Sequence, residues 1–112
     1  METIFDKILR GEIPCEKVYE DDVVLAFKDI QPQAPVHVLV IPKYRISGFQ
    51  DIKGQEEQLT GAFFRRVAVV ASELGLESGY RVVVNQGQDG GQEIEYLHAH
   101  ILGRRQMQWP PG

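Results

Sequence analysis

The residues best suited to chemistry are two histidines, His98 and His100, which lie two positions apart late in the chain. Side chains alternate between the two faces of a β-strand, so both imidazoles would point to one side, roughly 6.5–7 Å apart along the chain. Leu97, Ala99 and Ile101 would then point into the core. A half-buried strand of this kind would hold the two rings rigidly at a surface cleft, as a reactive group requires.

Two neighbouring imidazoles allow three interpretations. The ordinary imidazole pKa is near 6.5, so one neutral ring can attack phosphorus while a protonated neighbour binds a phosphate oxygen. The same pair can contribute to a zinc site. The third interpretation is two half-exposed histidines without any chemistry, and a His-x-His pattern alone does not decide among the three.

A turn-rich loop, residues 85–92, leads into the histidine strand and contains three glycines and three glutamines. The exposed backbone N–H groups of such a loop can bind phosphate. The alternative is a flexible connection between two strands. The loop has neither the Walker pattern nor the Rossmann glycine pattern.

Five segments rich in β-branched and aromatic residues are predicted strands, each bounded by polar turns, glycines or prolines. They cover residues 18–19, 23–27, 36–41, 80–84 and 96–102. A proline-containing break at 31–35 precedes the third strand, and residues 109–112 are expected to form an extended, polyproline-like tail.

Two segments with apolar residues at helical spacing are predicted helices, a short one at 3–10 and a long one at 55–74. In the long helix a single apolar stripe is formed by Leu59, Phe63, Val67, Val70 and Leu74, and Gly75 suits the C-terminal stop. The order of elements lacks alternating strand–helix units. It therefore predicts an α+β fold, an antiparallel sheet with the helix on one face.

Length and charge limit the class of protein. The 112 residues fit one domain, and a net charge of −4 argues against a surface that coats nucleic acid. A small phosphorylated ligand is still allowed, because one pocket can be locally positive. The lone Cys15 cannot form an internal disulfide. We see no signal peptide and no apolar run near the ~18 residues that cross a bilayer, so no membrane partner and a cytoplasmic location are expected.

Matching blocks of sequence extend over nearly the whole chain. They are Ile4-Phe5, Gly11-Glu12-Ile13-Pro14, Phe27-Lys28-Asp29-Ile30-Gln31-Pro32-Gln33-Ala34-Pro35, His37 with Leu39-Val40-Ile41-Pro42-Lys43, Gly79-Tyr80-Arg81-Val82-Val83-Val84-Asn85, Asp89-Gly90-Gly91-Gln92 and the terminal run from Leu102 to Gly112. In these blocks the chain resembles the histidine triad (HIT) superfamily, in particular its nucleotide-binding HINT branch of adenosine phosphoramidases. The resemblance implies a single HIT domain over 1–112 with a tail at 104–112. It also implies a five-stranded antiparallel sheet in each subunit of a homodimer, with the two sheets joined across the interface.

The same resemblance implies an activity. Members of this branch bind purine mononucleotides and hydrolyse nucleoside phosphoramidates through a nucleotidylated histidine, without a cofactor. His98 matches the nucleophile, His100 matches the third triad histidine that contacts the phosphate, and His37 matches a supporting histidine on a neighbouring strand. The expected ligand is therefore a purine mononucleotide or a nucleoside phosphoramidate.

Further positions match the nucleotide-binding residues of the branch. Asp29 matches the acid that binds the ribose. A carboxylate accepts hydrogen bonds well from two vicinal hydroxyls. Ile30 lies where the family packs the base, Asn85 matches a polar residue near the phosphate, and Gln92 ends the loop. The tail that carries Trp109 reaches the partner subunit's site in the family and influences the choice of leaving group.

Two substitutions depart from the family pattern. Tyr96 replaces the first triad histidine but keeps the backbone carbonyl that orients the ring of His98. Glu93 replaces a serine, and a carboxylate facing a phosphate is repulsive by about 1–4 kcal/mol at ~4 Å. Glu93 could swing out, take up a proton or pair with a cation. Arg104, which replaces a family glycine, would share the face of the histidines by strand parity and is a candidate partner.

The positions that bind structural zinc in some bacterial relatives hold other residues here. Thr3 and Asp6 occupy the two cysteine positions and Arg45 occupies a histidine position, so no metal site is expected. Two alternatives to a hydrolase remain open. One is a nucleotide-binding scaffold dimer with weak or no catalysis, because of Tyr96 and Glu93, and the other is a metal-binding protein that uses the three histidines.

Overall fold

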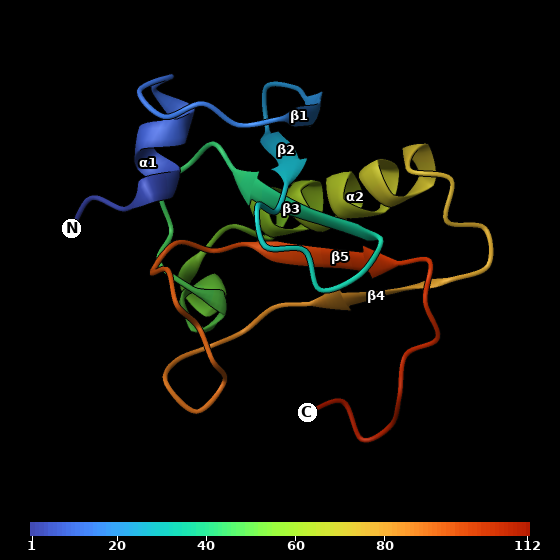
Figure 1. The fold of residues 1–112 in the computed structure, drawn as a ribbon. Helices are drawn as coiled ribbons and strands as arrows, with labels where there is room; N and C mark the ends of the chain where they lie inside the picture. The colour runs from blue at the N-terminus through green and yellow to red at the C-terminus, as the bar shows by residue number, and fades with distance from the viewer.

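A five-stranded antiparallel sheet in the order β1-β2-β3-β5-β4 forms the centre of the computed structural model, which describes all 112 residues (Figure 1). The strands are β1 (Lys17–Glu20), β2 (Val24–Lys28), β3 (Val36–Pro42), β4 (Tyr80–Val83) and β5 (Ala99–Gly103). The helices are α1 (Ile4–Leu9), the 3-10 helix η1 (Phe49–Gly54) and α2 (Glu57–Glu73). The α+β fold expected from the sequence is therefore confirmed.

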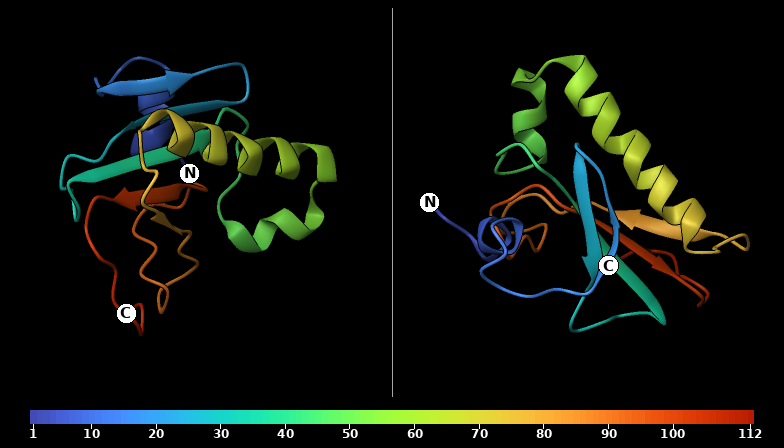
Figure 2. Two further views of the ribbon diagram at one scale, coloured as in Figure 1. Left: turned by 90° about the vertical axis from the view of Figure 1, so that its right-hand side faces the viewer. Right: turned by 90° about the horizontal axis from the view of Figure 1, so that it is seen from above.

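The two faces of the sheet bury different clusters, with α2 over one face and α1 on the other side (Figure 2). The cluster under α2 includes Val38, Val40 and Phe63. The cluster beside α1 includes Phe5 and Leu39. Because β3 contributes alternate residues to both clusters, it reads as a nearly continuous apolar run in the sequence.

The helix ends follow from local chemistry. Thr3 and Asp6 form a capping box at the start of α1. Each side chain accepts a hydrogen bond from the backbone N–H of the other residue. Gly75, at φ +69°, follows α2 as the predicted C-terminal stop. Within the predicted stripe Leu59 is exposed, because the first turn of α2 lies outside the cluster that buries the rest of the helix. No helix of the protein combines the length and the apolar character needed to cross a membrane.

The last strand is shorter than predicted. It begins at Ala99, and residues 96–98 form an irregular segment before it. The reason is that the Leu97 N–H donates to the carbonyl of Ile46 at 2.8 Å rather than to a neighbouring strand of the ladder. The alternation of side chains nevertheless continues through the bend, since Leu97, Ala99 and Ile101 join the cluster under α2 and Tyr96 joins the opposite one.

Gly103 ends β5 at a point where a side chain would not fit. A Cβ there would lie 2.7 Å from Cδ2 of Leu76, a buried side chain that packs beneath α2. We expect Gly103→Ala to lower the free energy of unfolding by about 1–3 kcal/mol, because overpacking displaces Leu76. Urea denaturation measures the change.

Gly61→Ala is the matched control, since a Cβ at Gly61 meets nothing within 4 Å on the exposed side of α2. Alanine is the better helix former, so this variant should gain about 0.5–1 kcal/mol. Equal effects of the two substitutions would contradict the packing at Gly103.

Candidate active site

The three histidines of the chain converge on the sheet face opposite α2. In the β3–β5 ladder His37 pairs with Leu102 and Leu39 pairs with His100, so the two imidazoles lie diagonally on neighbouring strands. The ring centroids are 5.2 Å apart for His37 and His100 and 5.0 Å apart for His98 and His100. His37 and His98 are only 6% and 7% exposed. The prediction that His98 and His100 share a face is confirmed.

These rings line a cavity of about 540 Å³ with two kinds of wall. One wall is apolar and is formed by α1, the segment after it and the sheet: Ile4, Phe5, Ile8, Ile13, Pro14, Phe27, Ile30 and Leu39. The ring of Phe5 meets His98 edge-on, with centroids 5.1 Å apart. The polar wall includes Asp29, Asn85 and Glu93. Such a cavity suits a ligand with a flat apolar part and a polar group beside the histidines.

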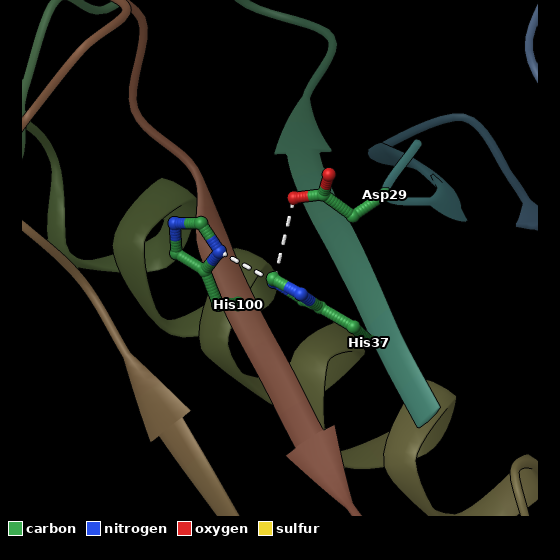
Figure 3. Close-up of side chains that lie close together, drawn as sticks. All are labelled: Asp29, His37 and His100. Carbon is green, nitrogen blue, oxygen red and sulfur yellow. Dashed lines mark hydrogen bonds and ion pairs between the residues drawn. The ribbon is translucent and has the colours of Figure 1, made fainter. Parts of the chain in front are cut away.

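A chain of hydrogen bonds fixes the tautomers of two rings. The backbone N–H of Gln33 donates to Nδ1 of His37 at 3.0 Å, so in the neutral ring Nε2 of His37 carries the proton. That Nε2 lies 2.9 Å from Nδ1 of His100 and 3.4 Å from Oδ2 of Asp29 (Figure 3). If His37 donates to His100, the proton of His100 lies on its own Nε2, which has no protein partner. The backbone of Gln33 thereby aims an N–H of His100 at the cavity.

The third ring is oriented by a backbone carbonyl. Nδ1 of His98 lies 2.6 Å from the carbonyl oxygen of Tyr96. A carbonyl only accepts, so Nδ1 carries the proton and Nε2 keeps its lone pair. The Tyr96 side chain is anchored separately, because its hydroxyl donates to the carbonyl of Pro42. His98 therefore combines a fixed ring with a free nucleophilic nitrogen at the cavity.

All three imidazoles favour the neutral form. Burial lowers the pKa of His37, with the Asp29 carboxylate acting in the opposite direction. Burial also lowers the pKa of His98, opposed by its bond to Tyr96. For His100 burial and the two neighbouring histidines lower the pKa to about 4. At pH 7 the pair therefore consists of two neutral rings, and His100 presents an N–H to the cavity rather than a full positive charge.

These pKa shifts predict a loss of stability on mild acidification. The unfolded chain takes up protons on its histidines as the pH falls through about 6.5, whereas the folded protein does not until lower pH. The free energy of unfolding should therefore fall steadily between pH 6.5 and about 4. Thermal unfolding followed across this range, with NMR titration of the imidazoles, measures both effects.

The matched control for the acid effect is His100→Gln, which removes the ring with the largest lowering of pKa. Above about pH 5 ordinary carboxylates remain ionised, so the histidines dominate the proton uptake there. The variant should lose less stability than the wild type between pH 6.5 and 5. An NMR pKa at or above 6.5 for His100 would contradict the burial of its ring.

Asp29, His37 and His100 bring three possible metal ligands within 4.8 Å of one another. A metal on Nε2 of His37 needs a lone pair there, and hence a proton on Nδ1. Nδ1 instead accepts from the Gln33 N–H, so this donor set does not suit a metal in the observed arrangement.

The structure places the predicted nucleotide-binding residues in different surroundings. Those that line the cavity are Asp29, Ile30, Asn85 and Glu93. Gln92 does not, because its side chain closes the loop by accepting from Gly87 N–H and donating to the carbonyl of Ser47. Trp109 is 81% exposed on the tail and does not line the cavity of its own chain.

The loop at 85–92 uses much of its hydrogen-bonding capacity internally. The N–H of Gly91 donates to Gln88 and that of Gln92 donates to Gly87, while Gly87 N–H donates to the Gln92 side chain. These three N–H groups are therefore not free to bind phosphate. Of the loop, Asn85 and Gly91 reach the cavity.

The predicted pairing of Arg104 with Glu93 is wrong. Arg104 follows the end of β5 with φ +66°, which breaks the strand parity behind the prediction. Its guanidinium lies 3.5 Å from the carbonyl of Leu74, at the C-terminal end of α2. Glu93 is exposed at the cavity without a cationic partner.

The residues at the zinc positions of relatives interact with one another. Arg45 lies 3.4 Å from Oδ1 of Asp6, and its guanidinium carbon sits 5.1 Å from the ring centre of Tyr96. It also donates to the carbonyl of Met1. An ion pair and a cation–π contact thus tie α1 to the segment that precedes His98.

Two contributors to the site were missed from the sequence. The sequence places Phe5 in the short predicted helix and in a matching block without a role in the site, although its ring packs on His98. Gln33 was assigned to a proline break, although its backbone N–H sets the tautomer of His37. A backbone donor has no signature in the sequence, so no signal pointed to the second.

Comparison with known proteins gives consistent matches. A model of the HIT domain family matches residues 10–107. The chain is 50% identical to the 14 kDa zinc-binding protein of Zea mays, over 98% of this chain and 88% of that protein. It is 46% identical to adenylylsulfatase HINT1 of Arabidopsis thaliana, over 98% of this chain and 76% of that protein. The solved structure of a HIT family hydrolase from Legionella pneumophila is 46% identical and superposes with a TM-score of 0.93, covering 99% of this chain and all of that one.

Proposed function

Because this chain belongs to the HIT domain family, we propose that it hydrolyses purine nucleoside phosphoramidates through a nucleotidyl intermediate on His98. The observation that carries the proposal is the state of that ring. It is buried, its Nδ1–H is fixed on the carbonyl of Tyr96, and its Nε2 opens to the cavity without a partner. A neutral, oriented imidazole is a nucleophile ready to attack phosphorus.

The cavity walls support binding of a nucleotide. The apolar wall beside Phe5 accepts a purine ring, and Ile30 extends this wall at the cavity rim. Asp29 binds the ribose hydroxyls through carboxylate oxygens, in exchange for its contact with His37. Asn85 lies on the polar wall, where an amide can donate to the phosphate.

In the first step, Nε2 of His98 attacks the phosphorus in line, and the bond from phosphorus to the amine nitrogen breaks. The electron pair stays on the amine, which takes a proton from solvent and leaves. The Nε2–H of His100 donates to a phosphate oxygen, where negative charge grows in the transition state. His37 holds His100 in this tautomer and is thus a positioning residue.

In the second step, water attacks the phosphorus of the nucleotidyl-histidine. The bond from phosphorus to Nε2 breaks, and its electron pair returns to His98. The water oxygen remains on the nucleoside monophosphate, and its protons pass to solvent. Both steps use the same fixed ring, so the site is restored after each turnover.

The names of two relatives support a hydrolytic reaction at a nucleotide. The Arabidopsis protein is an adenylylsulfatase and the Legionella protein is a hydrolase. The observation that favours a weaker catalyst is Glu93, a carboxylate on the cavity without a cation beside it. The second candidate function is therefore a nucleotide-binding scaffold with feeble turnover.

One experiment separates the two functions. The protein is incubated with an AMP–amine phosphoramidate, AMP release is followed, and acid- and base-quenched samples are digested for mass spectrometry. The hydrolase predicts AMP release and an adenylyl group on the peptide that contains His98, absent in His98→Gln. Binding of AMP without release or adduct would reject the hydrolase and favour the scaffold.

We propose in addition that the protein is a homodimer, as expected for this branch. The edge strand β4 has one ladder partner only, and its Tyr80 and Val82 side chains are exposed. An unpaired strand edge with exposed apolar side chains suits pairing with a second copy. Light scattering that gives the mass of a single chain would reject the dimer.

A further inference from the structure

Glu93 stands out because it is a carboxylate on the wall of the histidine cavity that has no ion-pair partner. It lies between the loop at 85–92 and the segment that carries His98, and it lines the same cavity as the histidines. Its side chain takes part in none of the eight contacts between a carboxylate and a basic side chain in the structure. Its carboxylate is thus available to a ligand that enters this cavity.

The charges around the cavity are mainly negative. The charged side chains on its walls are Lys28, Asp29 and Glu93. Lys28 is neutralised by Glu16, with 2.6 Å between Nζ and the carboxylate. The histidines are neutral because burial lowers the pKa of each. A second anionic group on a substrate would therefore meet carboxylates and no free cation.

The direction of attack places the leaving group near the cavity mouth. His98 is 7% exposed, and its Nε2, unlike its Nδ1, makes no hydrogen bond to the protein. An in-line displacement puts the leaving group on the far side of the phosphorus from this nitrogen, and hence toward solvent. Glu93 is an exposed residue of the same cavity, and its charge reaches His98, whose pKa it raises against the larger lowering from burial.

We propose that Glu93 forms a leaving-group subsite for a cation, so that the preferred substrates are nucleoside phosphoramidates of amines that carry a second, positively charged group. The inference rests on the hydrolase function proposed above. Diamines and basic side chains belong to this class, whereas leaving groups with a carboxylate or sulfate do not. The departing amine keeps the electron pair of the broken phosphorus–nitrogen bond and takes its proton from solvent, while its distant ammonium group pairs with Glu93.

Three probes with four-carbon leaving groups test the proposal. AMP is linked through its phosphorus to 1,4-diaminobutane, to butylamine and to 4-aminobutyrate, which end in an ammonium group, a methyl group and a carboxylate. In the wild type kcat/KM should fall in this order, by about 2- to 5-fold per step for an exposed charge contact. Added salt should reduce the differences in kcat/KM among the probes, because it screens the interaction between Glu93 and the charged end of the leaving group.

Two variants assign the effect to one residue. Glu93→Gln removes the charge and should bring the three values within about threefold of one another. Glu95→Gln is the matched control, since Glu95 is an exposed carboxylate two residues away that does not line the cavity. This control should keep the wild-type order. An order that survives in Glu93→Gln, or disappears in Glu95→Gln, would overturn the assignment.

A binding measurement tests the leaving-group subsite independently of hydrolysis. Kd of the three probes is measured by calorimetry on His98→Ala, which lacks the nucleophile, and should follow the same order. Equal turnover of all three probes by the wild type would overturn the subsite and leave the hydrolase standing. Ordered binding without any turnover or adduct would overturn the hydrolase and support the subsite.

Discussion

Replacing His98 by alanine is expected to lower kcat/KM for an AMP–amine phosphoramidate at least about 1,000-fold, because the covalent route is lost. The Nε2 of this ring is the one imidazole nitrogen that combines a lone pair with access to the cavity. Initial rates of AMP release over a range of substrate concentrations measure the loss. The adenylyl adduct should disappear at the same time.

His100→Gln is the informative comparison for this variant. It removes a hydrogen-bond donor to the phosphate but leaves the nucleophile, so the expected loss is about 100-fold and the adduct should still form. Far-ultraviolet circular dichroism checks that both variants are folded. A His98→Ala protein that keeps turnover within tenfold of the wild type would refute His98 as the nucleophile.

Phe63→Ala is expected to have the largest effect on stability, about 3–5 kcal/mol of the free energy of unfolding. Phe63 is fully buried in the cluster under α2, and its ring meets Phe64 edge-on with centroids 5.0 Å apart. Alanine would leave a void that the sheet and helix cannot close. Typical domains are stable by only 5–15 kcal/mol, roughly, so this change removes a large share of the total.

Denaturation in urea, followed by circular dichroism, measures this loss. Phe49→Ala is the matched control, since it deletes the same atoms from a half-exposed position in η1 and should cost less than about 1 kcal/mol. Because Phe63 packs on the face of the sheet away from the histidines, folded Phe63→Ala protein should keep kcat/KM within a fewfold of wild type. Equal losses of stability in the two variants would contradict the packing of α2.

The parts of the site that follow from side-chain alternation could be predicted from the sequence. His98 and His100 share a face because alternate residues of the segment pack into the cluster under α2, whether or not the backbone there is a regular strand. The five strands could be located because β-branched runs with turn residues on both sides are typical of a buried sheet.

The parts that depend on long-range backbone contacts could not be predicted. The last strand begins later than predicted because Leu97 N–H bonds to the carbonyl of Ile46, a residue half a chain away. Arg104 turns away from the histidines because its φ is positive, a conformation that is rare for a residue with a side chain. The sequence placed Gln92 among the nucleotide-binding positions, because its bond to Gly87 N–H forms only when the loop is folded.

The contact between His98 and the Tyr96 carbonyl has a consequence for how this protein tolerates change. Every amino acid carries a main-chain oxygen, so no replacement of the side chain at position 96 can delete this acceptor. What the side chain must do is fill the space between Phe5 and Arg45 well enough to keep the oxygen in place. The orientation of the reactive ring therefore depends directly on the main chain of residue 96 and only indirectly, through packing, on the side chain there.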